Sequence, residues 1–97
     1  MSVEEFQNND AGYLTWLAEN QDGYVINIQR NLTPSDARLH HAGCRTISGV
    51  PTKGKTWTEL YIKVCSVDLD TLDTWAIDHI SSSITRCSTC QVPRQRL

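Results

Sequence analysis

The sequence predicts a small α+β domain in which two helices pack on an antiparallel meander of three strands. Three observations lead to this fold class. Apolar residues recur at helical spacing in two segments, 10–20 and 68–80. Apolar and polar residues alternate with a period of two at 24–30, 37–41 and 58–65. Turn-forming residues separate these segments, so the predicted order is helix, three strands, helix.

A chain of 97 residues is long enough for one domain, which we place at 1–97. We expect its polar ends, 1–9 and 91–97, to be flexible. No apolar run approaches the roughly 20 residues that cross a membrane. The acidic N-terminus does not resemble a secretory signal. We therefore expect a cytoplasmic protein with no membrane partner.

The N-terminal half predicts a helix followed by two paired strands. Asp10 can cap the helix, the stretch YLTWL supplies its apolar face, and Gly23 lies just past its end. The segment YVINIQR, 24–30, alternates as a strand does and is rich in β-branched residues. After the turn NLTPSD, the short strand ARLHH at 37–41 should pair with it.

The C-terminal half predicts the third strand and the second helix. A basic loop, GVPTKGKT at 49–56, precedes the strand TELYIKVC at 58–65. Ser66 or Asp68 would cap the helix, which runs to about Ile80 with leucines and a tryptophan on one stripe.

The cysteines and histidines form two short ligand pairs. LHHAGC, 39–44, contains His-x-x-x-Cys, and CSTC, 87–90, is Cys-x-x-Cys. In a reducing compartment these spacings favour metal or redox chemistry over structural disulfides. Structural zinc takes four thiolate and imidazole ligands in a tetrahedron. We therefore expect one zinc ion that staples the fold, with a ligand set of His40 or His41 together with Cys44, Cys87 and Cys90.

Two further readings of these residues stay open. Cys65 can replace the histidine and give a four-cysteine site, although a small buried residue at a strand end is its more common role. CSTC can also be a redox dithiol. A thioredoxin-like motif, however, stands at a helix N-terminus just after a strand, whereas this one follows the second helix.

LHHAGCRTI followed by RCSTC resembles the zinc-binding domain of the bacterial Ada DNA-repair protein, over about 39–90. Cys44, Cys87 and Cys90 match its pattern, and the resemblance favours His40 as the fourth ligand. His40 stands where Ada has the cysteine that accepts a methyl group from DNA phosphate. An imidazole is not such a nucleophile, so the resemblance implies a metal-held accessory module and not alkyl transfer.

The whole chain also resembles a bacterial family of unassigned function. That family shares the order Tyr-x-x-Trp-Leu, Gly-Tyr-Val-x-Asn, Leu-His, Cys and Cys-x-x-Cys.

The predicted function is that of a small, non-catalytic binding module, because a closed four-ligand zinc site has no open position for a substrate. The net charge is −2, but basic residues gather at 30–63 and in the tail. We expect a nucleic-acid partner whose phosphates contact Arg45, Lys53, Lys55 and Arg86. The alternatives are a protein partner that binds the acidic helices and a thiol redox protein.

Overall fold

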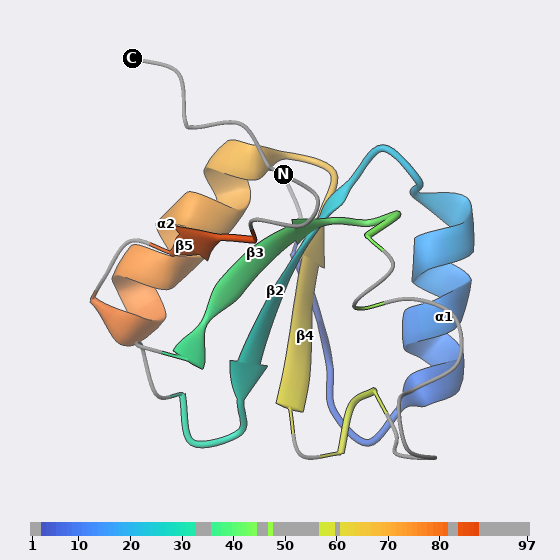
Figure 1. The fold of residues 1–97 in the computed structure, drawn as a ribbon, viewed down its shortest axis with the longest axis horizontal. Helices are drawn as coiled ribbons and strands as arrows, with labels where there is room; N and C mark the ends of the chain where they lie inside the picture. The colour runs from blue at the N-terminus through green and yellow to red at the C-terminus, as the bar shows by residue number, and fades with distance from the viewer. Residues whose placement is uncertain are drawn as a thin grey trace.

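The computed structural model describes residues 3–32, 36–44, 47, 57–59, 61–81 and 84–87. It confirms a small α+β domain with two helices. The elements within these residues are, in chain order, β1 (Glu4–Phe6), α1 (Asp10–Glu19), β2 (Tyr24–Gln29), β3 (Arg38–His41), β4 (Tyr61–Ser66), α2 (Leu69–Ile80) and β5 (Thr85–Arg86). The sheet stands in the middle, with α1 on one side and α2 on the other (Figure 1).

The strands form one mixed sheet in the order β1-β4-β2-β3-β5. β2 is antiparallel to both β3 and β4, β1 is antiparallel to β4, and β5 is parallel to β3. The predicted three-strand meander is therefore wrong, because β4 pairs with β2 and not with β3. Val25 and Ile26 point to opposite faces of β2 and are both fully buried. β2 lies at the centre of the sheet, so an apolar core covers each of its faces and a neighbouring strand covers each of its edges.

The sequence prediction also omitted the two edge strands. β1 lies within 1–9, which we expected to be flexible, and it pairs with β4 from Glu4 to Phe6. β5 has only two residues. Strands of two or three residues are too short for their periodicity to be recognised. The predicted tail, 91–97, lies outside the described residues.

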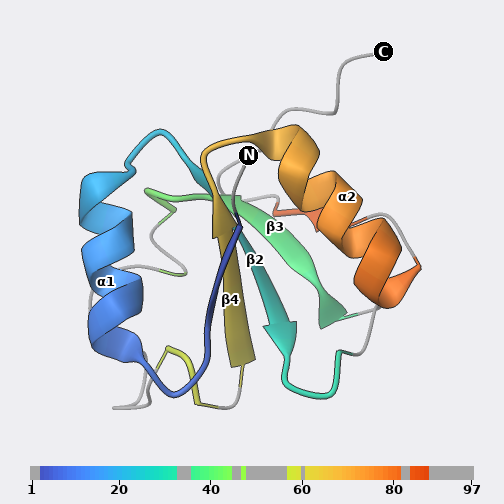
Figure 2. The same ribbon diagram turned by 180° about the vertical axis from the view of Figure 1, so that it is seen from behind.

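Each face of the sheet has its own apolar core. Figure 2 shows the same layers from behind, with β1 in front of the other strands. The α2 face is built from residues that include Ile26, Leu39, Val64, Leu72, Trp75 and Ile80. The α1 face is built from residues that include Phe6, Tyr13, Trp16, Val25, Cys65 and Cys87. Because successive strand residues point to opposite faces, β2 and β4 contribute to both cores.

Helix capping differs from the prediction at α1 and confirms one of the two alternatives at α2. Asn9, not Asp10, caps α1, and its side-chain oxygen accepts from the Gly12 amide at 3.0 Å. Asp68 caps α2 and accepts from the amide of Asp70 at 3.3 Å. Asp10 is the first helical residue of α1, and its carboxylate has a different partner.

That partner is the segment 57–59, which the carboxylate of Asp10 holds against the start of α1. It accepts hydrogen bonds from the amide of Trp57 at 2.8 Å and from the amide and hydroxyl of Thr58 at 2.9 and 2.6 Å. The ammonium group of Lys63, on the next strand, donates to the carbonyl oxygen of Trp57. This group lies 5.7–5.8 Å from the ring centres of Tyr13, Trp57 and Tyr61. Burial lowers the pKa of Lys63 to about 8.

Asp10→Ala removes the three hydrogen bonds to segment 57–59. One hydrogen bond to a charged group contributes about 1.5–3 kcal/mol, so we expect the free energy of unfolding in urea to fall by at least that amount. Asp22→Ala, at an exposed turn position, is the matched control and should change it by less than about 0.5 kcal/mol. Equal effects of the two substitutions would contradict a role of Asp10 in holding the segment.

The same variant should show a defined pH dependence. Burial raises the pKa of Asp10, but hydrogen bonds from Thr58 and Trp57 and the charge of Lys63 outweigh it and lower the pKa overall. A carboxyl group with a lowered pKa in the folded state stabilises the fold above its unfolded pKa, and this is lost as pH falls through the folded pKa. The stability difference between wild type and Asp10→Ala should therefore shrink below about pH 4. A difference that stays constant down to pH 2 would contradict this account.

Candidate metal centre

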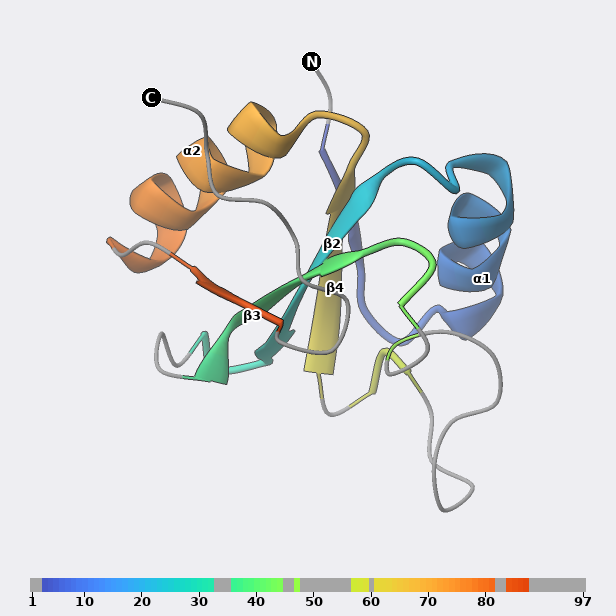
Figure 3. The same ribbon diagram turned by 45° about the horizontal axis from the view of Figure 1, so that its top comes forward.

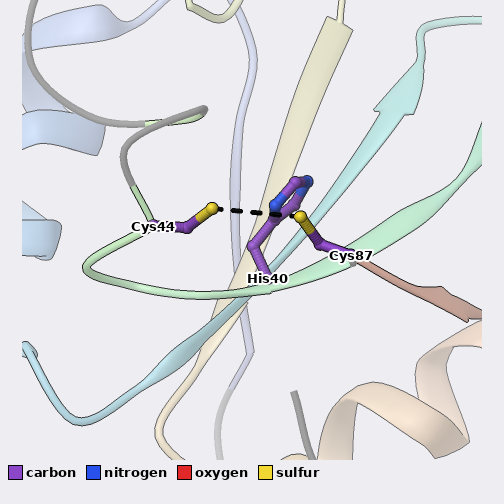
Figure 4. Close-up of side chains that lie close together, drawn as sticks. All are labelled: His40, Cys44 and Cys87. Atoms are coloured by element: carbon purple, nitrogen blue, oxygen red, sulfur yellow. Dashed lines mark hydrogen bonds between the residues drawn. The ribbon is translucent and has the colours of Figure 1, made fainter. Parts of the chain in front are cut away.

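Three of the predicted ligands lie together in the structure. The ligand atoms of His40, Cys44 and Cys87 all lie within 4.8 Å of one another, and the two sulfurs are 4.0 Å apart. Figure 4 shows the imidazole of His40 pointing to the same place as both sulfur atoms. The three side chains come from β3, from the turn that follows it and from the residue after β5.

The alternation of side chains along β3 places His40, and backbone hydrogen bonds place Cys44 and Cys87. His40 lies beside Leu39, which packs in the core of the α2 face, so its own side chain points to the α1 face. The turn after β3 closes with a bond from the amide of Cys44 to the carbonyl oxygen of His41 at 3.0 Å. The amide of Cys87 donates to the carbonyl oxygen of Leu39 at 2.9 Å, which extends the β3–β5 pairing and places Cys87 next to His40. Figure 3 shows β5 alongside β3.

The three side chains are buried. His40 is 5% exposed, Cys44 is 3% exposed and Cys87 is 9% exposed. Burial lowers the pKa of His40 to about 4, with smaller contributions from the charges of Lys63 and Arg38. At neutral pH the imidazole is therefore uncharged, which is the form that binds metals. No disulfide joins any two of the cysteines that the structure describes.

The distance between the two sulfurs fits a tetrahedral metal ion. Two sulfurs bound at about 2.3 Å to a tetrahedral zinc lie roughly 3.8 Å apart, close to the 4.0 Å between Cys44 and Cys87. Two thiolates and one imidazole suit zinc and other borderline or soft cations better than they suit magnesium or calcium. His40, Cys44 and Cys87 can therefore hold a metal ion.

The other candidate ligands occupy different places. Cys90 lies outside the described residues. His41 is half-buried, points to the face opposite to that of His40 and has its ring 5.4 Å from that of Tyr24. Cys65 is fully buried and is separated from His40 by Val25, the residue opposite both in the sheet register. Burial raises the pKa of the Cys65 thiol, as expected of a core cysteine. The group thus contains His40 and neither alternative.

One predicted phosphate contact is described, and it is engaged within the protein. Arg86 points to the α2 side, where its Nη2 lies 3.8 Å from Oδ2 of Asp73. Its Nη1 donates to the carbonyl oxygen of Ile84 at 3.1 Å. Arg45, Lys53 and Lys55 lie outside the described residues.

The role of Tyr13 beside this group was not predicted from the sequence. Tyr13 is fully buried in α1, and its hydroxyl donates to the carbonyl oxygen of Ile47, whose amide donates to the carbonyl oxygen of Cys44 at 3.1 Å. Burial raises the pKa of Tyr13, so the hydroxyl stays protonated and remains a donor. The helical pattern predicted Tyr13 only as a core residue. Every residue has a backbone carbonyl group, so the sequence does not indicate which one a side chain will reach.

The comparisons with known proteins give no match: no family model, no curated protein and no solved structure is significantly similar to the chain. They have no bearing on the resemblance to the Ada zinc domain. The structure adds that none of the helices it describes is long and apolar enough to span a membrane.

A metal ion held by His40, Cys44 and Cys87 should be lost from Cys44→Ser and kept by Cys65→Ser. The reason is that Cys44 belongs to the close group and Cys65 belongs to the core of the α1 face. Both cysteines are buried, so the pair is matched in environment. Native mass spectrometry of each variant gives the metal content. Loss of metal from Cys65→Ser with retention by Cys44→Ser would reverse the assignment of the ligands.

Proposed function

We propose that the protein is a small, non-catalytic binding module whose fold is stapled by one zinc ion. The ligands would be His40, Cys44, Cys87 and Cys90. The observation that supports this proposal is the close group of one imidazole and two thiols, all buried, from three separate segments. Cys90 follows Cys87 at the spacing that lets two sulfurs bind one ion.

A structural role for the metal follows from what it would connect. β5 has two residues and is paired with β3 alone among the described strands, so it has few interactions of its own. A domain of this size has a thin core, and metal-binding energy then becomes folding energy. A zinc ion between the turn after β3 and the residue after β5 would fix both at this end of the sheet.

A closed site of this kind supports binding and not catalysis. Catalytic zinc keeps one position for water or substrate, whereas four protein ligands fill the tetrahedron. The three described ligands are at most 9% exposed, which restricts access by a substrate. A thiol redox role for CSTC would require that Cys87 and Cys90 bind no metal.

Of the two partner classes, the described residues favour a protein over a nucleic acid. Arg86 is held by Asp73 and by the carbonyl oxygen of Ile84. The N-terminal segment 1–22 carries Glu4, Glu5, Asp10, Glu19 and Asp22 and contains no lysine or arginine. All of these except Asp10 are exposed, and exposed carboxylates repel phosphates and attract basic groups.

The test of the zinc proposal is native mass spectrometry before and after a strong chelator, with circular dichroism recorded alongside. We expect one zinc per chain and loss of the folded spectrum when the metal is removed, because its binding energy contributes to folding. Readdition of zinc should restore the spectrum. A metal-free chain with an unchanged spectrum would contradict the proposal and would favour redox chemistry at CSTC.

The partner class can be tested with fluorescently labelled single-stranded and duplex DNA and RNA at low and high salt. A module that binds only proteins should bind none of these nucleic acids at low salt. Binding that weakens steeply with salt would instead show phosphate contacts and restore the nucleic-acid partner.

A further inference from the structure

A groove lies between the edge strand β1 and the helix α1. Its volume is about 330 Å³, and the described residues that line it are Glu4, Phe6, Ala11, Gly12, Thr15, Trp16 and Glu19. Phe6 and Trp16 are each 8% exposed, whereas Glu4 and Glu19 are exposed residues. The groove is large enough for a side chain and is separate from the group of His40, Cys44 and Cys87.

The charge of this groove selects a cation. Two of its described lining residues are carboxylates and none is basic. Lys63 lies opposite Phe6 in the sheet, but it is 2% exposed and donates to Trp57, so its ammonium group does not line the groove. A pair of carboxylates beside two aromatic side chains is a favourable surface for a lysine or arginine side chain, because carboxylates and aromatic rings both attract a cation.

The backbone next to the groove offers a second means of recognition. β1 is at one edge of the sheet, and among the described strands it pairs with β4 only. In Figure 2 it lies in front of the other strands, and no described strand pairs with its outer edge. An edge strand carries backbone donors and acceptors that an extended peptide can pair with, and alternate side chains of that peptide then reach the pockets beside the strand.

β1 is held firmly enough to serve as a template. On the face opposite the groove, the carboxylate of Glu5 accepts a hydrogen bond from Nε1 of Trp75 at 2.9 Å. Just after β1, the amides of Asn8 and Asn9 donate at 2.7 Å to the carbonyl and hydroxyl oxygens of Thr58. A strand already ordered in the free protein reduces the entropy lost on binding.

We propose that β1 and the groove beside it form a docking site for an extended basic peptide segment of a partner protein. The segment would add as a strand to β1 and place a lysine or arginine between Glu4 and Glu19 over Trp16. This inference deepens the proposed binding function by naming the surface and the chemistry of the partner. It does not use the metal ligands.

The probe is a synthetic peptide, Thr-Lys-Val-Lys-Val-Lys-Thr with blocked ends, titrated into ¹⁵N-labelled, zinc-loaded protein. We expect amide shifts confined to β1 and to the groove face of α1, and binding that weakens as salt rises. The same peptide with glutamate in place of each lysine should not bind. A lysine peptide methylated on alternate backbone nitrogens should also fail, because it cannot pair with β1.

Variants of the protein test the charge. Glu4→Gln and Glu19→Gln should each weaken binding of the lysine peptide about two- to fivefold, the range for a partly exposed ion pair. Asp78→Asn, at an exposed position of α2, is the matched control and should leave it unchanged. The double variant Glu4→Lys with Glu19→Lys should lose the lysine peptide and bind the glutamate peptide.

The outcomes separate this proposal from the zinc proposal. No binding by a folded, zinc-loaded chain would overturn the docking site and leave the metal centre standing. Binding of the lysine peptide by a folded chain without zinc would support the docking site and contradict the zinc proposal. Concentration-dependent dimers with shifts at β1, in the absence of peptide, would show that a second copy of the chain occupies the edge and would overturn the peptide proposal.

Discussion

The parallel pairing of β5 with β3 is the contact on which the candidate metal centre depends. It brings the end of the described chain back to the middle, and the bond from the amide of Cys87 to Leu39 places a cysteine next to His40. Cys44 and Cys87 are 43 residues apart in the sequence, yet their sulfurs come within 4.0 Å. A two-residue strand has little stability of its own, so a metal ion at its end would secure the same contact that creates the site.

The core of the α1 face links this group to the rest of the domain. Cys44, Ile47 and Cys87 belong to the same apolar cluster as Tyr13 and Trp57. The hydroxyl of Tyr13 reaches Ile47, while Asp10 at the start of the same helix holds segment 57–59. α1 therefore contacts the connection between β3 and β4 at two described places, Ile47 and segment 57–59. The hydroxyl of Tyr13 and the carboxylate of Asp10 serve here as specific anchors, because each has a hydrogen-bond partner in this connection.

The two ends of the sheet differ in their chemistry. The β3–β5 edge carries the buried thiols and the imidazole, whereas the β1 edge carries exposed carboxylates beside aromatic rings. The proposed metal site and the proposed docking site therefore lie at opposite edges of one sheet.

The sequence by itself determined the elements that have a clear period. Both helices followed from apolar residues at helical spacing, the three longer strands from alternation, and the pairing of β2 with β3 from the turn between them. It also determined the types of metal ligand, since thiols and imidazoles at chelating spacings are informative without a structure. Only the tertiary structure decided that β2 is central, that β1 and β5 complete the sheet and that His40 faces the cysteines while His41 faces Tyr24. The physical reason is that strand order and the choice of face depend on which surfaces become buried together. Burial of both faces of β2 is a property of the whole fold and not of any one segment.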